Sequence, residues 1–568
     1  MKTYLFIYSI GPVQSFIAAA RKTEDYWSGS YLLSYLTERT IEQVLQKNQY
    51  NVKVLSPSIT LEEIQKSKAN PSQVASLPNR FLVRLEAESD ESVRLFGKEI
   101  EETTKLSFIT LGEKAFHKVF PNLKNNEYIK QLIKTQLTNL LEIYWAFEEW
   151  DNSTPEKYND VRNLVERRLA SVKNNRSFKE ISQEGLVCTV CGTREALHEG
   201  NINENHTIGQ MHRIIKQTWR KRSRKYQETD EDKGARIKDN ERLCAVCLTK
   251  RLTREIIFDY NSNAIRLFEP FPSVKEFVTE NNPYYAIFMM DGDDIGKWLK
   301  GSDGKLLSEF PEVNEAYHQE FSRRLTIFSK DKVPNIVEKQ LNNQTKNVGK
   351  LIYSGGDDVL AFISLSHLLP VIKELREAFS ASDVLGNKAT ASMGIVIAHY
   401  KEPLQKVIRT AQQMEAVAKQ YHNNYQEKDA VSISLISNSG QTRFVTIPWY
   451  LDAEKSHSVI DVLTYLNKAF GTDLSSTFLY HFNEAFAPLI HGGKKPNVSL
   501  EIIESELRRL IKRSAKNKNI TEKLIKNLIL IYNLTETFTE YIHLLETIRF
   551  IAGKINVAST LQAREGVD

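Results

Sequence analysis

The chain has 568 residues, of which 41% are hydrophobic and 26% are charged, a composition typical of a soluble protein with three or four globular domains. Its net charge of +5 permits contact with nucleic acid without requiring it. No apolar run approaches the roughly 18–20 residues of a membrane span. The N-terminus lacks a signal-peptide cleavage site, so we expect a cytoplasmic protein without membrane contact.

Residues 1–180 are predicted to form an α+β unit with a small sheet. An apolar strand over Met1–Tyr8 leads into a Gly-Pro turn and a helix, and helical patterns dominate from Glu91 to Ala170. Gly11 and Gln14 lie where free backbone N–H groups at a helix start could face a phosphate. On spacing alone, a plain strand-to-helix turn explains the same residues.

Residues 181–275 contain all four cysteines of the chain, in two C-x-x-C pairs separated by 52 residues. The cysteines are Cys188, Cys191, Cys244 and Cys247. In a cytosolic chain this pattern indicates a metal site, and two such pairs form a closed four-sulfur zinc site with a structural role. The nearby His198, His206 and His212 are alternative ligands.

A basic run, Arg213–Lys225, lies between the cysteine pairs and contains Trp219, with Tyr226 directly after it. Basic residues interleaved with aromatic residues suit single-stranded RNA. A solvated helix face has the same composition. The C-terminal run Arg508–Lys518 has the same two interpretations.

Residues 276–445 carry the clearest domain pattern. A buried strand over Tyr284–Met290 ends at an Asp-Gly-Asp-Asp sequence, and Leu351–Ile363 reads as a β-hairpin with Ser-Gly-Gly-Asp-Asp at its turn. With the helices and strands that follow, the order is strand–helix–strand–strand–helix–strand. This is the ferredoxin-like split βαβ order of polymerase and nucleotide-cyclase palms.

Three acids are expected to converge in this domain. Asp291 ends one strand, and Asp357 and Asp358 sit on the neighbouring hairpin. With the Gly292 carbonyl they form a hard oxygen site suited to magnesium or manganese. Two such metals can activate a 3′-hydroxyl, bridge a triphosphate and stabilise the leaving pyrophosphate. A lone Gly-Gly-Asp-Asp could be a simple turn, but the upstream Asp291 favours nucleotidyl transfer.

Two further charged positions in this domain have open interpretations. Lys419 lies late on the helix after the fourth strand, where it either reaches a triphosphate as a point charge or faces solvent. Asp294 is placed to cap the helix that begins at Ile295.

The spacing of apolar residues predicts amphipathic helices in residues 446–568. The chain contains neither a His-Asp dipeptide nor a Gly-x-x-x-x-Gly-Lys-Ser/Thr motif. A metal phosphohydrolase of the HD type and a P-loop are therefore not encoded in this sequence.

At these motifs the sequence resembles the large polymerase/cyclase-like subunit of type III CRISPR–Cas effector complexes, in the Cmr (type III-B) branch. The motifs are Ile10–Ile17, Trp27–Ser34, the two cysteine pairs, Met290–Trp298 and Ser354–Asp358, in family order. The resemblance implies an α+β chain with two GGDEF-like palm domains, the first lacking metal acids. It also implies a zinc-binding insert and a C-terminal helical domain.

The resemblance implies an activity as well. When the guide RNA of the complex pairs with a target RNA, family members convert ATP into a messenger, usually cyclic oligoadenylate, in antiviral defence. Asp291, Asp357 and Asp358 would be the metal ligands. Ser354 would lie near the bound nucleotide, with Gly355 and Gly356 leaving room for it. Other Cmr-type subunits, guide RNA and target RNA would be the partners.

The sequence departs from many relatives by starting directly at the first palm, without an HD nuclease. We therefore expect no DNase activity and a role in signalling alone. For relatives without HD, transfer of the adenylyl group to a different acceptor, such as an adenosyl metabolite, is an alternative activity. A non-catalytic scaffold that grips RNA is a further alternative. A solitary GGDEF-type cyclase fits the palm but not the zinc insert or the tandem palms.

Overall fold

The computed structural model describes two compact units. The first comprises Met1–Ser273, Gly296–Lys330 and Ile352–Gly356, and the second comprises Val274–Ile295, Asp331–Leu351 and Asp357–Asp568. The division into four domains at 180, 275 and 445 remains a prediction. The residues described are 1–47, 49–69, 72, 74–121, 127–151, 157–175, 185–199, 206–225, 237–257, 272–279, 282–339, 348–424, 426–437, 442–475, 477–490, 494–514 and 521–565.

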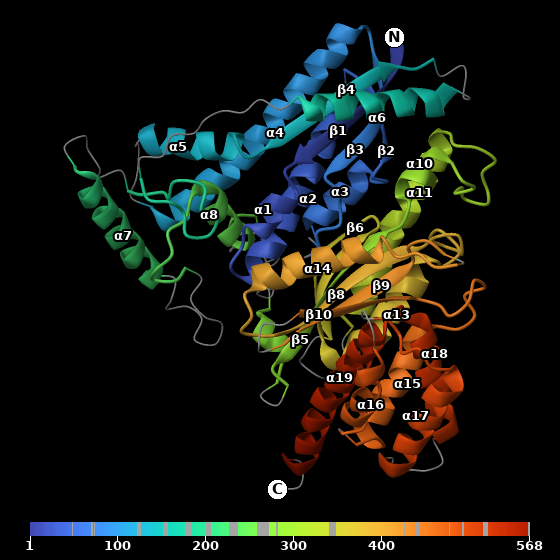
Figure 1. Ribbon diagram of the computed structural model, residues 1–568. Helices are drawn as coiled ribbons and strands as arrows, with labels where there is room; N and C mark the ends of the chain where they lie inside the picture. The colour runs from blue at the N-terminus through green and yellow to red at the C-terminus, as the bar shows by residue number, and fades with distance from the viewer. Residues whose placement is uncertain are drawn as a thin grey trace. The chain divides into compact units, whose positions relative to one another are not determined.

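The first unit is built on a four-stranded antiparallel sheet with the order β2-β3-β1-β4 (Figure 1). Its strands are β1 (Lys2–Gly11), β2 (Asn51–Ser56), β3 (Arg80–Ala87) and β4 (Glu142–Glu149). With the helices between the strands, this is the split βαβ order. The central strand β1 is buried over Tyr4–Ile10, which explains its continuous apolar sequence.

Strand β4 corrects the prediction that helix dominates from Glu91 to Ala170. The segment pairs along β1, with Tyr4 opposite Glu149 and Gly11 opposite Glu142. Its sequence contains Ile143 and the aromatic residues Tyr144, Trp145 and Phe147, which favour strands. Pairing with a strand more than 130 residues away decides the conformation, and a local helical pattern does not contain that information.

The first unit also contains helices that pack on this sheet or on one another. They are α1 (Gln14–Ala18), α2 (Thr23–Gln46), α3 (Leu61–Ala69), α4 (Asp90–Val119), α5 (Glu127–Thr138), α6 (Tyr158–Asn174), α7 (Ile208–Lys225), α8 (Ala245–Arg251), α9 (Thr253–Ile257) and α11 (Glu315–Ile327). Helix α10 (Ile295–Lys300) starts at the boundary between the units. Helices α2, α4 and α8 pack against one another.

A buried ion network holds α8 to the start of α2. Arg251 is 1% exposed, and its guanidinium donates to Asp25 at 2.7 and 3.0 Å and to Glu241 at 2.8 Å. The neighbouring Lys250 donates from Nζ to the backbone carbonyls of Phe16 and Ala19 at 2.6 and 2.8 Å. These contacts satisfy two buried cations, which would otherwise be costly to bury.

The second unit contains a six-stranded sheet with the order β10-β9-β8-β5-β7-β6. Its strands are β5 (Tyr284–Gly292), β6 (Gly349–Gly355), β7 (Asp358–Ser364), β8 (Ala391–His399), β9 (Ala430–Ile436) and β10 (Thr442–Pro448). The part β8-β5-β7-β6 has the same split βαβ order as the first sheet, and β9 adds to it in parallel with β8. The predicted hairpin and palm strand order are confirmed.

Helix α14 (Leu404–Ala418) packs on β5, β8 and β9. Gly394 on β8 allows this close approach, because a Cβ there would lie 2.2 Å from the backbone nitrogen of Glu415 and 2.4 Å from the carbonyl oxygen of Ala411. Any other residue would push the helix off the sheet. The C-terminal end of α14 is thereby held next to the end of β5.

The other helices of the second unit include those of the C-terminal region, which was expected to be helical. They are α12 (Val333–Val337), α13 (Leu368–Phe379), α15 (Val459–Thr472), α16 (Phe478–Phe486), α17 (Leu500–Ser514), α18 (Thr521–Leu534) and α19 (Phe538–Glu565). Short 3₁₀ or π turns cover Val274–Phe277, Phe328–Lys332, Leu365–His367 and Ala487–Leu489. Among the described helices, none has an apolar stretch long enough to span a bilayer.

The buried network generates a stability prediction. Replacing Arg251 with Met leaves Asp25 and Glu241 buried without their counter-charge, so Arg251→Met is expected to lower the free energy of unfolding by about 3–5 kcal/mol. Urea denaturation followed by tryptophan fluorescence measures the change. The control is Arg323→Met, which removes an arginine whose pair with Glu320 is half exposed and should leave stability unchanged. Equal stability of the two variants would contradict the prediction.

Candidate functional site

The three predicted acids lie together in the second unit. Strand β5 pairs antiparallel with β7, with Met290 opposite Val359, so the end of β5 lies beside the β6–β7 turn. Asp291 is near the end of β5, Asp357 lies in the turn and Asp358 opens β7. One carboxylate oxygen from each acid lies within 4.8 Å of the others. The expected convergence of the carboxylates is therefore present.

Burial, with repulsion between neighbouring carboxylates, changes the acidity of the cluster. Burial raises the pKa of Asp357 to about 6, although its carboxylate accepts hydrogen bonds from its own N–H and from that of Gly292. Partial desolvation, together with repulsion by Asp357 and Glu415, raises the pKa of Asp358. Like charges this close resist ionisation unless a cation neutralises them. A cluster of hard carboxylate oxygens fits magnesium or manganese.

The two glycines of the turn have different environments. Gly356 has a φ of 68°, in the left-handed region, and a Cβ at this residue would meet no atom within 4 Å. A Cβ at Gly355 would lie 2.1 Å from the hydroxyl oxygen of Tyr353. Gly356 therefore leaves open space beside the turn that carries Asp357. At Gly355 any side chain would collide with the Tyr353 side chain.

Ser354 is completely buried, and both its polar groups have partners. Its backbone N–H donates to the carbonyl of Ala75 at 3.1 Å, and its hydroxyl donates to the carbonyl of Ser329 at 2.8 Å. Ser354 belongs to the first unit, and both of its partners lie in that unit. Its proximity to a bound nucleotide remains a prediction.

Lys419 faces the acids. It follows the last residue of α14, and its Nζ forms ion pairs with Asp291 and with Glu415, the latter at 2.8 Å. Burial and repulsion by Lys428 lower the pKa of Lys419 to about 8. Of the two interpretations of this lysine, the structure favours a position at the acid cluster over one on a free solvent face.

Two charged residues at the site were missed from the sequence. Glu415 lies one helical turn before Lys419 and close enough to Asp358 to raise its pKa, so the i,i+4 spacing was an available signal. Lys428 pairs with Asp294, the residue expected only to cap a helix. Nothing in the local sequence distinguishes Lys428 from other loop lysines.

Asp293, the residue after β5, holds the end of this strand through buried hydrogen bonds. It is 1% exposed and accepts hydrogen bonds from the hydroxyl of Ser392 at 2.8 Å and the backbone N–H of Asp429 at 3.0 Å. Asp429 is itself held by two hydrogen bonds from the buried Arg376, at 2.6 and 2.8 Å. The strand that carries Asp291 is thus fastened to the segment that carries Lys428.

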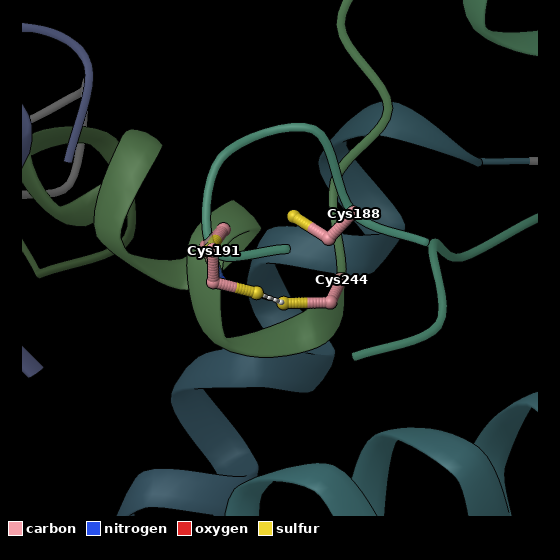
Figure 2. Close-up of side chains that lie close together, drawn as sticks. Cys188, Cys191 and Cys244 are labelled. Carbon is pink, nitrogen blue, oxygen red and sulfur yellow. Dashed lines mark hydrogen bonds between the residues drawn. The ribbon is translucent and has the colours of Figure 1, made fainter. Parts of the chain in front are cut away.

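The four cysteines form a second cluster, in the first unit. All four are free cysteines, outside any disulfide, and their sulfur atoms lie within 4.8 Å of one another. Figure 2 shows Cys188, Cys191 and Cys244 pointing toward one another, with the sulfurs of Cys191 and Cys244 separated by 3.8 Å. A tetrahedron of sulfurs about 2.3 Å from zinc has edges of about 3.8 Å. The backbone N–H of Cys247 donates to the sulfur of Cys244. The donor set therefore fits zinc.

The remaining predicted site residues belong to the first unit. Gly11 pairs with Glu142 in the sheet, and Gln14 is exposed at the start of α1. Among the alternative zinc ligands, His198 is buried and packs against the ring of Tyr128, and burial lowers its pKa to about 4. A phosphate contact at Gly11 and Gln14 remains a prediction.

Two protein families match parts of the chain. Residues 284–432 match the family described as Cas10/Cmr2, second palm domain, and this range contains Asp291, Asp357, Asp358 and Lys419. Residues 5–113 match the family described as CRISPR-associated protein Cmr2, N-terminal.

Curated relatives carry the same name. The chain is 30% identical over 179 residues to the CRISPR system Cmr subunit Cmr2 of Pyrococcus furiosus, covering 30% of this chain and 20% of the relative. It is 25% identical over 223 residues to the CMR subunit Cmr2 of Saccharolobus solfataricus, covering 33% of this chain and 21% of the relative. The matched regions thus span about a fifth of each relative's length.

The fold is similar to that of a solved complex. A chain of the type III-B Cmr-beta complex bound to cognate target RNA superposes with a TM-score of 0.66 and 16% identity, covering 97% of this chain and 83% of that chain. At this identity the likeness concerns the fold. Parts of this chain are thus similar to Cmr2 proteins: residues 284–432 match the Cas10/Cmr2 second palm domain and residues 5–113 match the Cmr2 N-terminal family.

Proposed function

We propose that the chain is the subunit of a type III-B effector complex that converts ATP into cyclic oligoadenylate when the complex pairs with target RNA. The observation that carries this proposal is the convergence of Asp291, Asp357 and Asp358 within 4.8 Å beside the turn of a palm-type sheet. A purely structural protein gains nothing from three adjacent carboxylates, which repel one another. A nucleotidyl transferase needs such a cluster to hold divalent cations.

The acids would hold magnesium or manganese. When bound, the metal would supply activation of a 3′-hydroxyl and neutralisation of the triphosphate. Burial raises the pKa of Asp357, and burial together with repulsion by Asp357 and Glu415 raises the pKa of Asp358. A bound divalent cation would favour the ionised form of these carboxylates. The open space beside Gly356 gives a phosphate access to the turn.

Lys419 would change partners during the reaction. It pairs with the Asp291 carboxylate, the same group that would bind the metal. Competition by a cation at Asp291 would release the ammonium toward the triphosphate, while Glu415 keeps the lysine near the site through its own ion pair. Lysine suits this role as a flexible point charge.

The partners follow from the relatives. The Cmr-beta chain of similar fold is part of a complex bound to cognate target RNA, and we propose an equivalent heteromeric complex with guide RNA and target RNA for this chain. The cysteine cluster would hold a structural zinc ion, since four thiolates close the coordination sphere and leave no position for a substrate.

The acid cluster is tested by Asp357→Ala combined with Asp358→Ala. In the assembled complex, supplied with labelled ATP, magnesium and matching target RNA, this variant is expected to lose product formation by at least about 10³-fold. The control Asp383→Ala removes an exposed aspartate of the same unit, paired with Lys332, and should leave the rate unchanged.

Mass spectrometry of the product separates the alternatives. Cyclic oligoadenylate that appears only with target RNA supports the proposal. Product without target RNA indicates an independent cyclase, and an adenylated metabolite indicates a different acceptor. If the unmodified complex forms no product, the non-catalytic scaffold is the alternative that remains. Each of these three outcomes contradicts the proposed reaction.

The triphosphate role of Lys419 is tested with Lys419→Ala. Loss of a charge that contacts the phosphates is expected to raise the KM for ATP and lower kcat/KM by about 10–100-fold, and Lys419→Arg should recover part of the loss. Lys406→Ala is the matched control, because Lys406 lies on the same helix and pairs with Glu402 on the surface, away from the acids. Identical kinetics for Lys419→Ala and Lys406→Ala would rule out the role.

Zinc binding is tested by metal analysis of the purified chain. We expect one zinc per chain, and loss of zinc in the double variant Cys244→Ser with Cys247→Ser, because half of the sulfur donors are removed. His212→Gln, which removes an alternative ligand, should keep the full zinc content. Retention of zinc by the cysteine variant would exclude the four-sulfur site.

A further inference from the structure

Helix α7 is anchored firmly through one face. Ile215 and Trp219 are fully buried, and the indole N–H of Trp219 donates to the carbonyl of Leu197 at 2.7 Å. The Trp219 ring meets the ring of Phe120 edge-on at 5.5 Å. The hydroxyl of Ser223 donates to Asp239 at 3.0 Å. These contacts fix which face of the helix points outward.

Trp219 therefore does not act as the stacking platform expected from the sequence. A base stacks only on an exposed aromatic face, and this ring is fully buried. Tyr226, the other aromatic residue of the run, lies outside the described residues. Any contact of α7 with nucleic acid must rest on its charges.

The outward face of α7 carries a stripe of cations, Arg213, Lys216 and Arg220, which we call the α7 stripe. These side chains are exposed, and their i, i+3, i+7 spacing aligns them over about 10 Å of helix. Lys221 flanks them and is also exposed. None of these four cations forms an ion pair with a residue that the structure describes.

Neighbouring cations behave differently. Arg222, on the inner side of α7, pairs with Glu199 and lies over the Phe120 ring. In the second basic run, Arg508 pairs with Glu504 and Glu522, and Arg509 pairs with Glu506 on the surface of the C-terminal helices. Ion pairing among the described residues thus distinguishes the two basic runs, which the sequence left equivalent. It favours the α7 stripe as the surface available to a ligand.

The chemistry of the stripe indicates a polyanion. A protein partner generally requires exposed apolar or aromatic residues at the centre of an interface. The other exposed residues beside the stripe, Gly209, Gln210 and Gln217, are small or polar. The exposed Ile208 is the first residue of α7 and lies on another side of the helix by the 3.6-residue period. Aligned arginine and lysine side chains without acidic partners suit a run of phosphates.

We propose that the α7 stripe binds the phosphate backbone of single-stranded RNA, without selecting its sequence. A flexible single strand can follow a short helix face and place its phosphates beside the aligned cations. The described part of α7 has no exposed aromatic residue on which a base could stack, so no base-specific contact is expected. The stripe belongs to the first unit, whereas the proposed reaction uses acids of the second. RNA binding by α7 and messenger synthesis can therefore fail independently.

The test compares full-length chains in a binding assay with labelled single-stranded RNA of mixed sequence at several salt concentrations. The stripe variant is Arg213→Gln, Lys216→Gln and Arg220→Gln, which preserves helix propensity. Each lost phosphate contact makes the negative slope of log affinity against log salt shallower by about 0.7, so the slope of the stripe variant should be shallower by about 2. Its RNA affinity at low salt should be lower by at least about tenfold.

A matched control removes three other exposed cations of the first unit, Lys98→Gln, Lys157→Gln and Arg167→Gln. It keeps the same net charge as the stripe variant, so it should bind RNA almost like the unmodified chain. Circular dichroism and zinc content should be unchanged in both variants. The Asp357→Ala, Asp358→Ala variant should retain full RNA binding even where product formation is lost.

Four outcomes would overturn the inference: no RNA binding by the unmodified chain, unchanged binding by the stripe variant, equal losses in the stripe and control variants, or binding of single-stranded DNA but not RNA. Weakening confined to the stripe variant supports it. Comparable weakening for RNA and single-stranded DNA of the same sequence would show that the phosphates alone are recognised, as the stripe predicts.

Discussion

Mutual repulsion among three carboxylates is the constraint around which the second unit is arranged. The pairing of β5 with β7 forces Asp291, Asp357 and Asp358 together within 4.8 Å. The surroundings offset this repulsion in part. The N–H of Gly292 donates to Asp357, and Lys419 pairs with Asp291. Burial and the repulsion that remains raise the pKa of Asp358, and a divalent cation at the cluster would offset both effects.

The segments beside the acids also hold backbone conformations that side chains rarely adopt. Asp294, Lys428 and Asp429 have φ values of 58°, 60° and 49°. Left-handed residues other than glycine cost of order 1 kcal/mol or more and persist only where surrounding contacts fix them. Here the ion pair between Lys428 and Asp294 and the hydrogen bond from Asp429 to Asp293 supply those contacts. The strain is concentrated next to the candidate catalytic group.

The sequence was informative where function depends on a short motif and uninformative where it depends on long-range pairing. Strand ends and a glycine turn predicted the convergence of Asp291 with Asp357, and the structure has it. Strand β4 was missed because its conformation is decided by pairing with β1. Lys428 was missed because a loop lysine carries no pattern. The sequence also left open which basic run is available, since ion pairing across α17 and α18 appears only in three dimensions.

The central claim is that the Asp291–Asp357–Asp358 cluster binds the cation that organises ATP. The most direct measurement is the location of manganese by anomalous scattering in crystals of the chain with a non-hydrolysable ATP analogue. The account predicts manganese within about 2.0–2.3 Å of oxygens from all three carboxylates, with Lys419 displaced from Asp291 toward the phosphates. Manganese bound elsewhere, with Lys419 still paired to Asp291 and the nucleotide remote from the β6–β7 turn, would contradict it.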